Sequence, residues 1–454
     1  MSLRIKPNWS ERPLLPIALG TALVLVTYVT PMATLPSAAG DLGAGTSARA
    51  WILSAMSVGL AGGLLAAGLL GDRFGRRGVY AVGLSAVAVG ALGCAVAWNP
   101  AILIGSRILQ GFGGAAVIAC GLAILAHSYP AAQQRAHATS IWGASIGAGI
   151  AGGSLLAMLL DLAAGWRSNY VVTAVLGALL LAGTLVTLPA SRATRLRPVD
   201  VPGLVLLVAG TVLLVAALTQ LRHGVTVSFV VLALSALCVL GVLGIVEARV
   251  RHPLIEPGLL RAPRVLAATI GALTVGVGTI GMTSFLPTVA QSGFGASLQL
   301  ASLPPLVWAV ASTFTAIAVR WLPFPVEGPW AVAILLALTS GFMLTAVGAE
   351  SVPRLILPMV LIGITSGLLN STLGREAVAS VPADHAATGS GANNTARYLG
   401  AACGITLFTI IATATTQDIV DGWSIAVFVA AGLTVLGALL IVARILIRTR
   451  RPGT

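Results

Sequence analysis

Long continuous runs of apolar residues are the feature that most restricts how this chain folds. A helical run of about 20 apolar residues crosses the hydrocarbon core of a bilayer, and a helix satisfies its own backbone hydrogen bonds in lipid. A transmembrane barrel would show short alternating strands instead. The chain therefore predicts an all-α integral membrane protein with fourteen transmembrane helices, at residues 13–35, 49–70, 78–98, 101–126, 137–160, 167–189, 201–221, 225–247, 265–289, 296–319, 329–349, 354–374, 387–414 and 422–446.

Composition excludes a soluble protein. Charged residues make up 9% of the 454 residues and hydrophobic residues 57%, whereas a soluble domain carries about 25% charged residues. The net charge of +13 does not indicate nucleic-acid binding, because the basic residues form small clusters between the apolar runs. With both termini in the cytoplasm, cytoplasmic segments hold twenty of the 26 basic residues. That asymmetry is the positive-inside pattern of a multi-pass protein of a cytoplasmic membrane.

The chain lacks the residues that several classes of function need. No nucleotide-binding GxxxxGK[ST] sequence occurs, so the chain is not expected to hydrolyse ATP. The histidines are scattered without catalytic or metal-ligand spacing. The cysteines fall inside apolar runs, where they read as small core side chains. We therefore expect neither an enzyme nor a metal or cofactor protein.

The loop after the second run carries the most specific motif. Residues 68–77 have the sequence GLLGDRFGRR. A glycine at 68 allows close approach of another helix, and an acid at 72 can face a helix N-terminus or pair with an arginine. This sequence resembles the signature G-x-x-x-D-R-x-G-R-R of the major facilitator superfamily. In that family the loop latches the two halves of the protein, which implies a conformational latch made of Gly68, Asp72, Arg73, Gly75, Arg76 and Arg77.

The fourth run contains a charged residue that is costly in a membrane. Residues 103–115, LIGSRILQGFGGA, place Arg107 and Gln110 three apart on one helical face. They resemble the superfamily's second motif, R-x-x-Q-G-x-G-x-A. An arginine within a span seldom lacks a role, although one that reaches the membrane interface would serve no transport step.

Small residues are concentrated in the fifth run, where 142–153 have the sequence WGASIGAGIAGG. The superfamily's exporters carry G-x-x-x-G-P-x-x-G-G here, and Gly149 stands where proline is expected. Two interpretations remain open, namely plain helix packing and an antiporter hinge. The residues concerned are Gly147, Gly149, Gly152 and Gly153.

Residues 200–203, 247–254 and 382–400 extend the resemblance to the fourteen-span drug:proton antiporter branch. It implies two six-helix bundles, residues 1–190 and 265–454. Between them, 191–264 would supply two linker spans and an interfacial segment. The substrate cavity would lie between the bundles near the midplane.

Polar and aromatic residues within the runs are the candidates for that cavity, although helix packing alone could explain any one of them. As a set they predict a large, mostly apolar cavity that suits amphipathic molecules. The candidates are Thr27, Tyr28, Trp51, Arg107, Gln110, Trp142, Asn370, Asn394 and Arg397.

The thirteen acids all map to loops or span ends. The antiporter branch carries an aspartate in its first span, and this chain has Thr27 there. Proton coupling, which the resemblance implies, would then use a span-end acid such as Asp41 or Asp72. With Arg107 and Arg397 as the fixed charges, the cavity is predicted to prefer neutral or anionic substrates.

The leading hypothesis is a secondary active transporter that exports hydrophobic or amphipathic small molecules, such as drugs, antibiotics or lipid-like metabolites, by alternating access. It is expected to be a proton-coupled monomer in the bilayer of a bacterial cytoplasmic membrane. Two alternatives stay open. One is a facilitator or importer of the same fold without proton coupling, and the other is a non-transporting membrane sensor.

Overall fold

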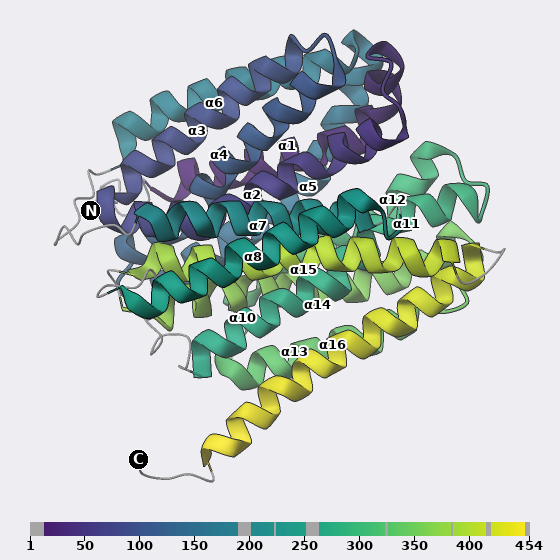
Figure 1. Cartoon of the computed structure of the whole chain (residues 1–454). Helices are drawn as coiled ribbons and strands as arrows, with labels where there is room; N and C mark the ends of the chain where they lie inside the picture. The colour runs from purple at the N-terminus through teal and green to yellow at the C-terminus, as the bar shows by residue number, and fades with distance from the viewer. Residues whose placement is uncertain are drawn as a thin grey trace, which may run out of the picture.

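The computed structural model describes residues 13–188, 201–221, 224–250, 263–322, 326–382, 385–414 and 419–449, and all regular structure in them is helical. Figure 1 shows the helices running side by side. Their bounds are α1 (Leu14–Asp41), α2 (Thr46–Phe74), α3 (Arg76–Ala95), α4 (Pro100–Ser128), α5 (Ala132–Ala164), α6 (Trp166–Thr187), α7 (Val201–Leu221), α8 (Val227–Arg249), α10 (Pro263–Val275), the π-helix η2 (Gly276–Ile280), α11 (Gly281–Ser292), α12 (Leu298–Ala318), the 3₁₀ turn η3 (Val319–Trp321), α13 (Gly328–Leu344), α14 (Val352–Ala379), α15 (Ala386–Ala414) and α16 (Ile419–Thr449).

Each predicted apolar run coincides with a helix, and α10, η2 and α11 together form the run at 265–289. Within the described residues, 12 helices are long and apolar enough to cross a membrane. The helix α13 is apolar but has only 17 residues. The helix α15 has 29 residues but includes many small and polar ones. The all-α transmembrane fold is confirmed, and the count of fourteen crossings stays a prediction.

The helices pack in two groups. In the first, α1 packs on α5 and α6, and α2 and α3 pack on α4. In the second, α12 packs on α14, α13 on α16, and α10 on α15. The groups meet where α15 packs on α2 and α12 packs on α5. The helix α7 lies along this seam against α2 and α15, and α8 packs on α7 (Figure 1). Asp200 and most of the predicted interfacial segment lie outside the described residues.

Glycine terminates two helices where the chain reverses direction. Gly75 joins α2 to α3 with a φ of 103°, and Gly165 joins α5 to α6 with a φ of 77°. Residues with a side chain rarely adopt such positive φ angles, so glycine is favoured at both positions. A different device begins α4, where the Asn99 side chain accepts a hydrogen bond from the Ile102 N–H (2.9 Å) and Pro100 follows the cap.

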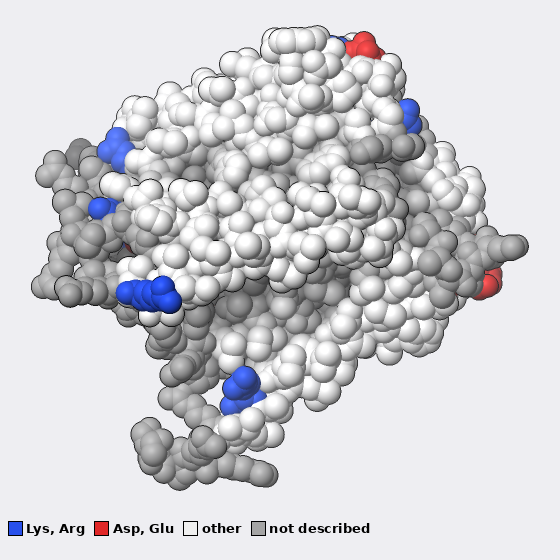
Figure 2. Space-filling model, viewed as in Figure 1, with Lys and Arg blue, Asp and Glu red and all other residues white. Residues whose placement is uncertain are grey.

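The outer surface suits lipid. Figure 2 shows charged side chains near the two ends of the helices and a broad uncharged zone between them. Most of the basic residues seen on this face lie toward the end where Figure 1 draws the chain termini. Many large apolar side chains are exposed on the helices, among them Val82, Val89, Leu179, Leu237 and Leu439. In water a protein with such a surface would aggregate, whereas in a bilayer the lipid chains contact these side chains favourably.

The glycines of α5 are not equivalent. A Cβ at Gly149 would lie 2.6 Å from the Ala22 carbonyl oxygen, and one at Gly153 would lie 2.7 Å from the Val26 Cα, both on α1. Gly147 instead faces the second group of helices, where a Cβ would lie 2.8 Å from the carbonyl oxygen of Ala309 in α12. A Cβ at Gly152 would meet no atom within 4 Å. Three of these positions thus allow close helix packing.

Gly149→Ala should therefore lower stability while Gly152→Ala should not. The added methyl at 149 collides with backbone, and overpacking typically costs about 1–3 kcal/mol. At 152 the methyl meets open space, and alanine is the better helix former by roughly 0.5–1 kcal/mol. Thermal unfolding of the purified variants in one detergent measures both. Equal midpoints for the two variants would contradict the assigned α1–α5 contact.

Candidate functional site

A cavity lies between the two groups of helices, and both groups contribute to its wall. The first group supplies residues of α1, α4 and α5, and the second supplies residues of α10, η2, α11, α12, α14 and α15. The volume of the cavity, taken as the space that the centres of water molecules can occupy, is about 110 Å³. By the same definition one water needs roughly 10–15 Å³. The wall consists of Thr21, Leu25, Tyr28, Val29, Ile118, Trp142, Ile146, Ile150, Val275, Ile280, Thr283, Ser284, Pro287, Pro305, Trp308, Ser366, Asn370, Asn394, Arg397 and Tyr398.

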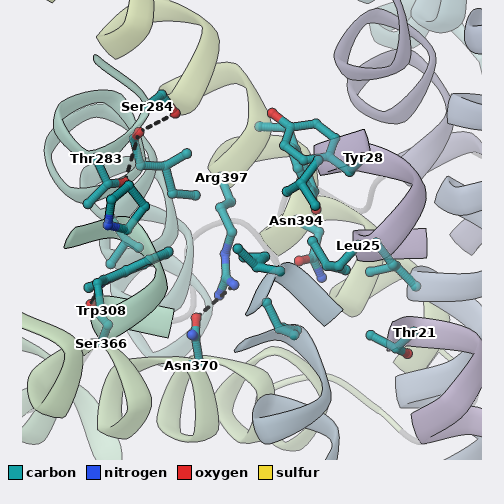
Figure 3. A pocket seen from close by; sticks show the side chains of 18 of the residues that line it. Thr21, Leu25, Tyr28, Thr283, Ser284, Trp308, Ser366, Asn370, Asn394 and Arg397 are labelled. Atoms are coloured by element: carbon teal, nitrogen blue, oxygen red, sulfur yellow. Dashed lines mark hydrogen bonds between the residues drawn. The ribbon is translucent and has the colours of Figure 1, made fainter. Parts of the chain in front are cut away.

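Several polar groups of the cavity are held by hydrogen bonds within the second group of helices. The guanidinium of Arg397 points into the space and donates from Nη1 to the Asn370 Oδ1 at 2.9 Å (Figure 3). The Asn394 amide donates to the Ser390 carbonyl (3.0 Å), and the Trp308 indole N–H donates to the Ser366 hydroxyl (3.0 Å). Arg397 is the one charged residue among the described residues of the wall.

Two aromatic rings meet across the boundary between the groups. Tyr28 of α1 and Tyr398 of α15 form an edge-to-face pair with centroids 6.1 Å apart. The Tyr28 hydroxyl accepts a hydrogen bond from Ser57 of α2 at 3.2 Å. Trp142 and Trp308 add two further rings to the wall. The cavity is therefore aromatic and apolar, with one positive charge.

The structure divides the predicted cavity residues into two sets. Tyr28, Trp142, Asn370, Asn394 and Arg397 border the cavity. The others do not, and they are Thr27, Trp51, Arg107 and Gln110. Sequence reasoning had no signal for the apolar wall of Leu25, Ile118 and Ile146, because an apolar residue in a span looks the same whether it faces lipid, protein or a cavity.

Arg107 lies inside the first group of helices instead. It is fully buried, and it donates to the carbonyl oxygens of Ile52 (3.0 Å), Thr27 (3.3 Å) and Tyr28 (3.5 Å). The Thr27 carbonyl would ordinarily bond the N–H four residues later, but that residue is Pro31, which has no N–H. Arg107 therefore supplies a donor that α1 lacks, and it joins α4 to α1 and α2.

Three neighbours of Arg107 also have internal roles. The Thr27 hydroxyl donates to the Leu23 carbonyl of its own helix at 2.8 Å. Gln110 is fully buried against α3, where its Oε1 accepts from the Cys94 thiol at 3.7 Å. Trp51 is half-buried against the core of the first group. These residues sit in that group's own packing and not in the space between the groups.

The acid of the 68–77 motif bridges the two groups of helices. Asp72, near the end of α2, accepts from the backbone N–H groups of Ala387 (3.1 Å) and Thr388 (2.7 Å), and from the Thr388 hydroxyl (2.8 Å). Those N–H groups belong to the first turn of α15. A carboxylate at this position accepts from N–H groups that have no partner within their own helix, and it is attracted to the positive end of the helix dipole.

Gly68 and Arg76 hold Asp72 in place, whereas Arg73 and Arg77 make contacts elsewhere. A Cβ at Gly68 would lie 2.4 Å from the Ala387 carbonyl oxygen, so only glycine lets α15 approach this closely. Arg76, the first residue of α3, forms a buried ion pair with Asp72 at 2.9 Å. Arg77 donates to the Leu185 carbonyl at the end of α6. The Arg73 guanidinium lies 5.1 Å from the centroid of the Phe74 ring.

Glu376 lies at a span end, as expected, but it is buried. It is buried near the end of α14, and its Oε1 accepts from the Gly328 N–H (2.9 Å) at the start of α13. The chain thus uses a second acid at a helix N-terminus, here within one group of helices. Its position, two residues beyond the predicted apolar run at 354–374, gave no sign of burial.

Three of the remaining described acids form ion pairs with arginine. Asp41 pairs with Arg167 and accepts from the Trp166 indole N–H, and these bonds hold the pKa of its exposed carboxyl below the ordinary value. Glu327 pairs with Arg375 (3.1 Å) and Glu350 with Arg354 (3.3 Å). Within the described part of the chain, no group of three or more His, Cys, Asp or Glu side chains could hold a metal ion.

Sequence comparison identifies relatives over nearly the whole chain. The family described as the Major Facilitator Superfamily matches residues 17–405. The puromycin resistance protein pur8 of Streptomyces alboniger is 31% identical over 449 residues, which cover 92% of this chain and 88% of the relative. The cephamycin export protein CmcT of Amycolatopsis lactamdurans is 30% identical over 397 residues, 85% of this chain and 82% of the relative.

Structure comparison gives the same fold. The crystal structure of the human organic anion transporter MFSD10 superposes with a TM-score of 0.70 at 18% identity, over 96% of this chain and 100% of that one. The proton:xylose symporter XylE superposes with a TM-score of 0.67 at 15% identity, over 96% and 95%. At these identities the likeness concerns the fold alone.

Arg107→Lys should lower the stability of the protein. Lysine keeps the charge but loses the planar fork that reaches carbonyls on two helices. Leaving a buried carbonyl without a donor costs about 1–3 kcal/mol. We expect a thermal midpoint several degrees lower in detergent. Exposed Arg354→Lys serves as the matched control, and an unchanged midpoint for Arg107→Lys would refute the bridging role.

Proposed function

Because the chain belongs to the Major Facilitator Superfamily, we propose that it is a secondary transporter that exports hydrophobic or amphipathic small molecules, such as drugs or antibiotics, by alternating access. One observation carries this proposal, namely a mostly apolar, aromatic cavity whose wall is shared by the two groups of helices. A site between two bundles can face either side of a membrane in turn when the bundles rock. Relatives named for puromycin resistance and cephamycin export support outward transport.

The proposal includes the topology. We keep the prediction of fourteen crossings. The two helices that it adds to the 12 long apolar ones are α13 and α15. Residues 1–190 and 265–454 would form the two bundles, with α7 and α8 between them. The end that carries most of the basic residues would face the cytoplasm, together with both termini. The proposed mechanism needs only binding and helix movement, and it therefore calls for no cofactor.

Asp72 acts in this mechanism as the cytoplasmic latch. Its bonds to Ala387 and Thr388 join α2 of one bundle to α15 of the other. They must break whenever the cytoplasmic end opens. Gly68 sets the distance of approach, and Arg76 neutralises the buried carboxylate while the latch is closed.

The latch also offers a route for proton coupling. Of the two span-end acids, Asp41 is exposed and its pKa is lowered by Arg167, so it stays ionised through neutral and mildly acidic pH. Asp72 is nearly buried and lies at the contact that moves. Protonating it would weaken the charge–dipole attraction to α15 and favour opening. We therefore assign coupling to Asp72.

A facilitator without proton coupling is the second candidate. The observation that favours it is the lack of a carboxylate among the described residues of the cavity wall. Both candidates share the cavity and the latch. Accumulation of substrate in inverted vesicles, with and without an imposed proton gradient, separates them.

The proposed export is tested in a bacterial strain that lacks its own multidrug pumps. Expression of the chain should raise resistance several-fold to some members of a panel that includes puromycin, a cephalosporin and polyketide antibiotics. Membrane insertion is checked by immunoblotting. Unchanged susceptibility to the whole panel, with the protein present in the membrane, would contradict the proposal.

Asp72→Asn should impair transport without preventing insertion. The amide keeps the shape but loses the charge, and a charge at a helix N-terminus contributes about 0.3–1 kcal/mol, or up to ~2 kcal/mol when partly buried. That shifts an equilibrium between two conformations several-fold. Transport rates at equal expression measure the effect. Exposed Glu350→Gln is the control, and a wild-type rate for Asp72→Asn would refute the latch.

A further inference from the structure

The guanidinium of Arg397 is only half satisfied by the protein. The residue is 4% exposed, and its Nη1 donates to Asn370. Within the described part of the chain, its Nε and Nη2 are buried and have no hydrogen-bond partner. A buried charge without partners is expensive, and an unpaired one in a membrane protein indicates a function.

The two unpaired nitrogens form one edge of the guanidinium. The N–H of Nε and one N–H of Nη2 run nearly parallel, which is the arrangement that binds both oxygens of a carboxylate at once. Asn370 holds the opposite side of the group, at Nη1, and so fixes how this edge is presented (Figure 3). The chain thus leaves one carboxylate-binding edge of a cavity-lining side chain open, that is, without a protein acceptor among the described residues.

Arg107 shows the contrasting solution within the same protein. It is equally buried, but each of its three nitrogens has a carbonyl acceptor. Arg397 lacks a comparable set, because Asn370 is the one acceptor that its guanidinium bonds among the described residues. Internal packing explains Arg107 and does not explain Arg397.

We propose that the Nε–Nη2 edge of Arg397 binds the anionic head of the transported molecule, so that the preferred substrates are amphipathic organic acids with an aromatic or aliphatic body. The inference rests on the proposed function and specifies its substrate class. The acid's oxygens accept from the open edge, and its apolar body lies among Tyr28, Trp142, Trp308 and Tyr398. Thr21, whose buried hydroxyl has no partner among the described residues, adds a further polar contact.

Binding of a matched pair of compounds tests this assignment. The probes are 1-naphthaleneacetate and 1-naphthaleneacetamide, which share shape and aromatic body and differ in charge. Equilibrium dialysis at pH 7 against the full chain in phosphatidylcholine nanodiscs measures both affinities. Two charge-assisted hydrogen bonds predict that the acid binds about tenfold more tightly than the amide.

Variants assign the preference to one side chain. Arg397→Gln should weaken acid binding about tenfold and leave amide binding nearly unchanged. Asn370→Asp places an internal carboxylate beside the guanidinium, and it should reduce the preference while keeping the arginine and the fold. Arg354→Gln removes an exposed positive charge, 64% accessible, at the far end of α14 and serves as the control for net charge.

The outcomes separate this inference from the proposed function. Equal affinities for acid and amide, unaltered by Arg397→Gln, would overturn the inference and leave an amphiphile transporter. Binding of neither probe would contradict both. Nanodiscs that contain phosphatidylglycerol form a further arm. If the anionic lipid abolishes acid binding in the wild type, a lipid head group occupies the edge and the assignment to free organic acids is overturned.

Discussion

Hydrocarbon offers no hydrogen bonds to a polar group, and this constraint explains where the buried charges of Arg107 and Asp72 lie. Arg107 is tolerated because Pro31 leaves a carbonyl of α1 without its helical donor, and two neighbouring carbonyls complete the set. Asp72 is tolerated because the first turn of α15 presents N–H groups that no helix residue can bond. Each charge therefore fastens one helix to another, and the packing of both bundles depends on these pairs.

The proposed mechanism separates static contacts from moving ones. Arg107 joins helices of the first group through carbonyls that would stay together as that group moves. Asp72 joins α2 to α15, whose contact would have to open under that proposal, and its bonds run to a helix end that water could also solvate. Arg397 belongs to neither class, because two of its nitrogens lack a protein acceptor among the described residues. A ligand that supplies an acceptor would form the hydrogen bonds that the protein leaves unmade, and these bonds would strengthen its binding.

Motifs predicted local contacts more reliably than depth or direction. The glycine and acid of residues 68–77 were expected at a helix contact, and the structure puts Gly68 and Asp72 against α15. Arg107 and Gln110 were expected at the cavity, yet they face the interior of the first group of helices. Ile118 on the same helix borders the cavity, roughly 16 Å further along the axis at 1.5 Å per residue. Periodicity shows which residues share a face and does not show what lies opposite.

The sequence by itself determined an all-helical membrane protein and, through two short motifs, the superfamily; from the basic loops it predicted an orientation. These properties follow from run length, charge and local spacing, which can be read directly from the sequence. Only the tertiary structure decided which polar residues share a cavity, that Arg107 is internally satisfied, and that Glu376 is buried. Those facts depend on which helices become neighbours and on how each is rotated. In a chain with apolar residues on every face, the pattern carries too little asymmetry to specify that rotation.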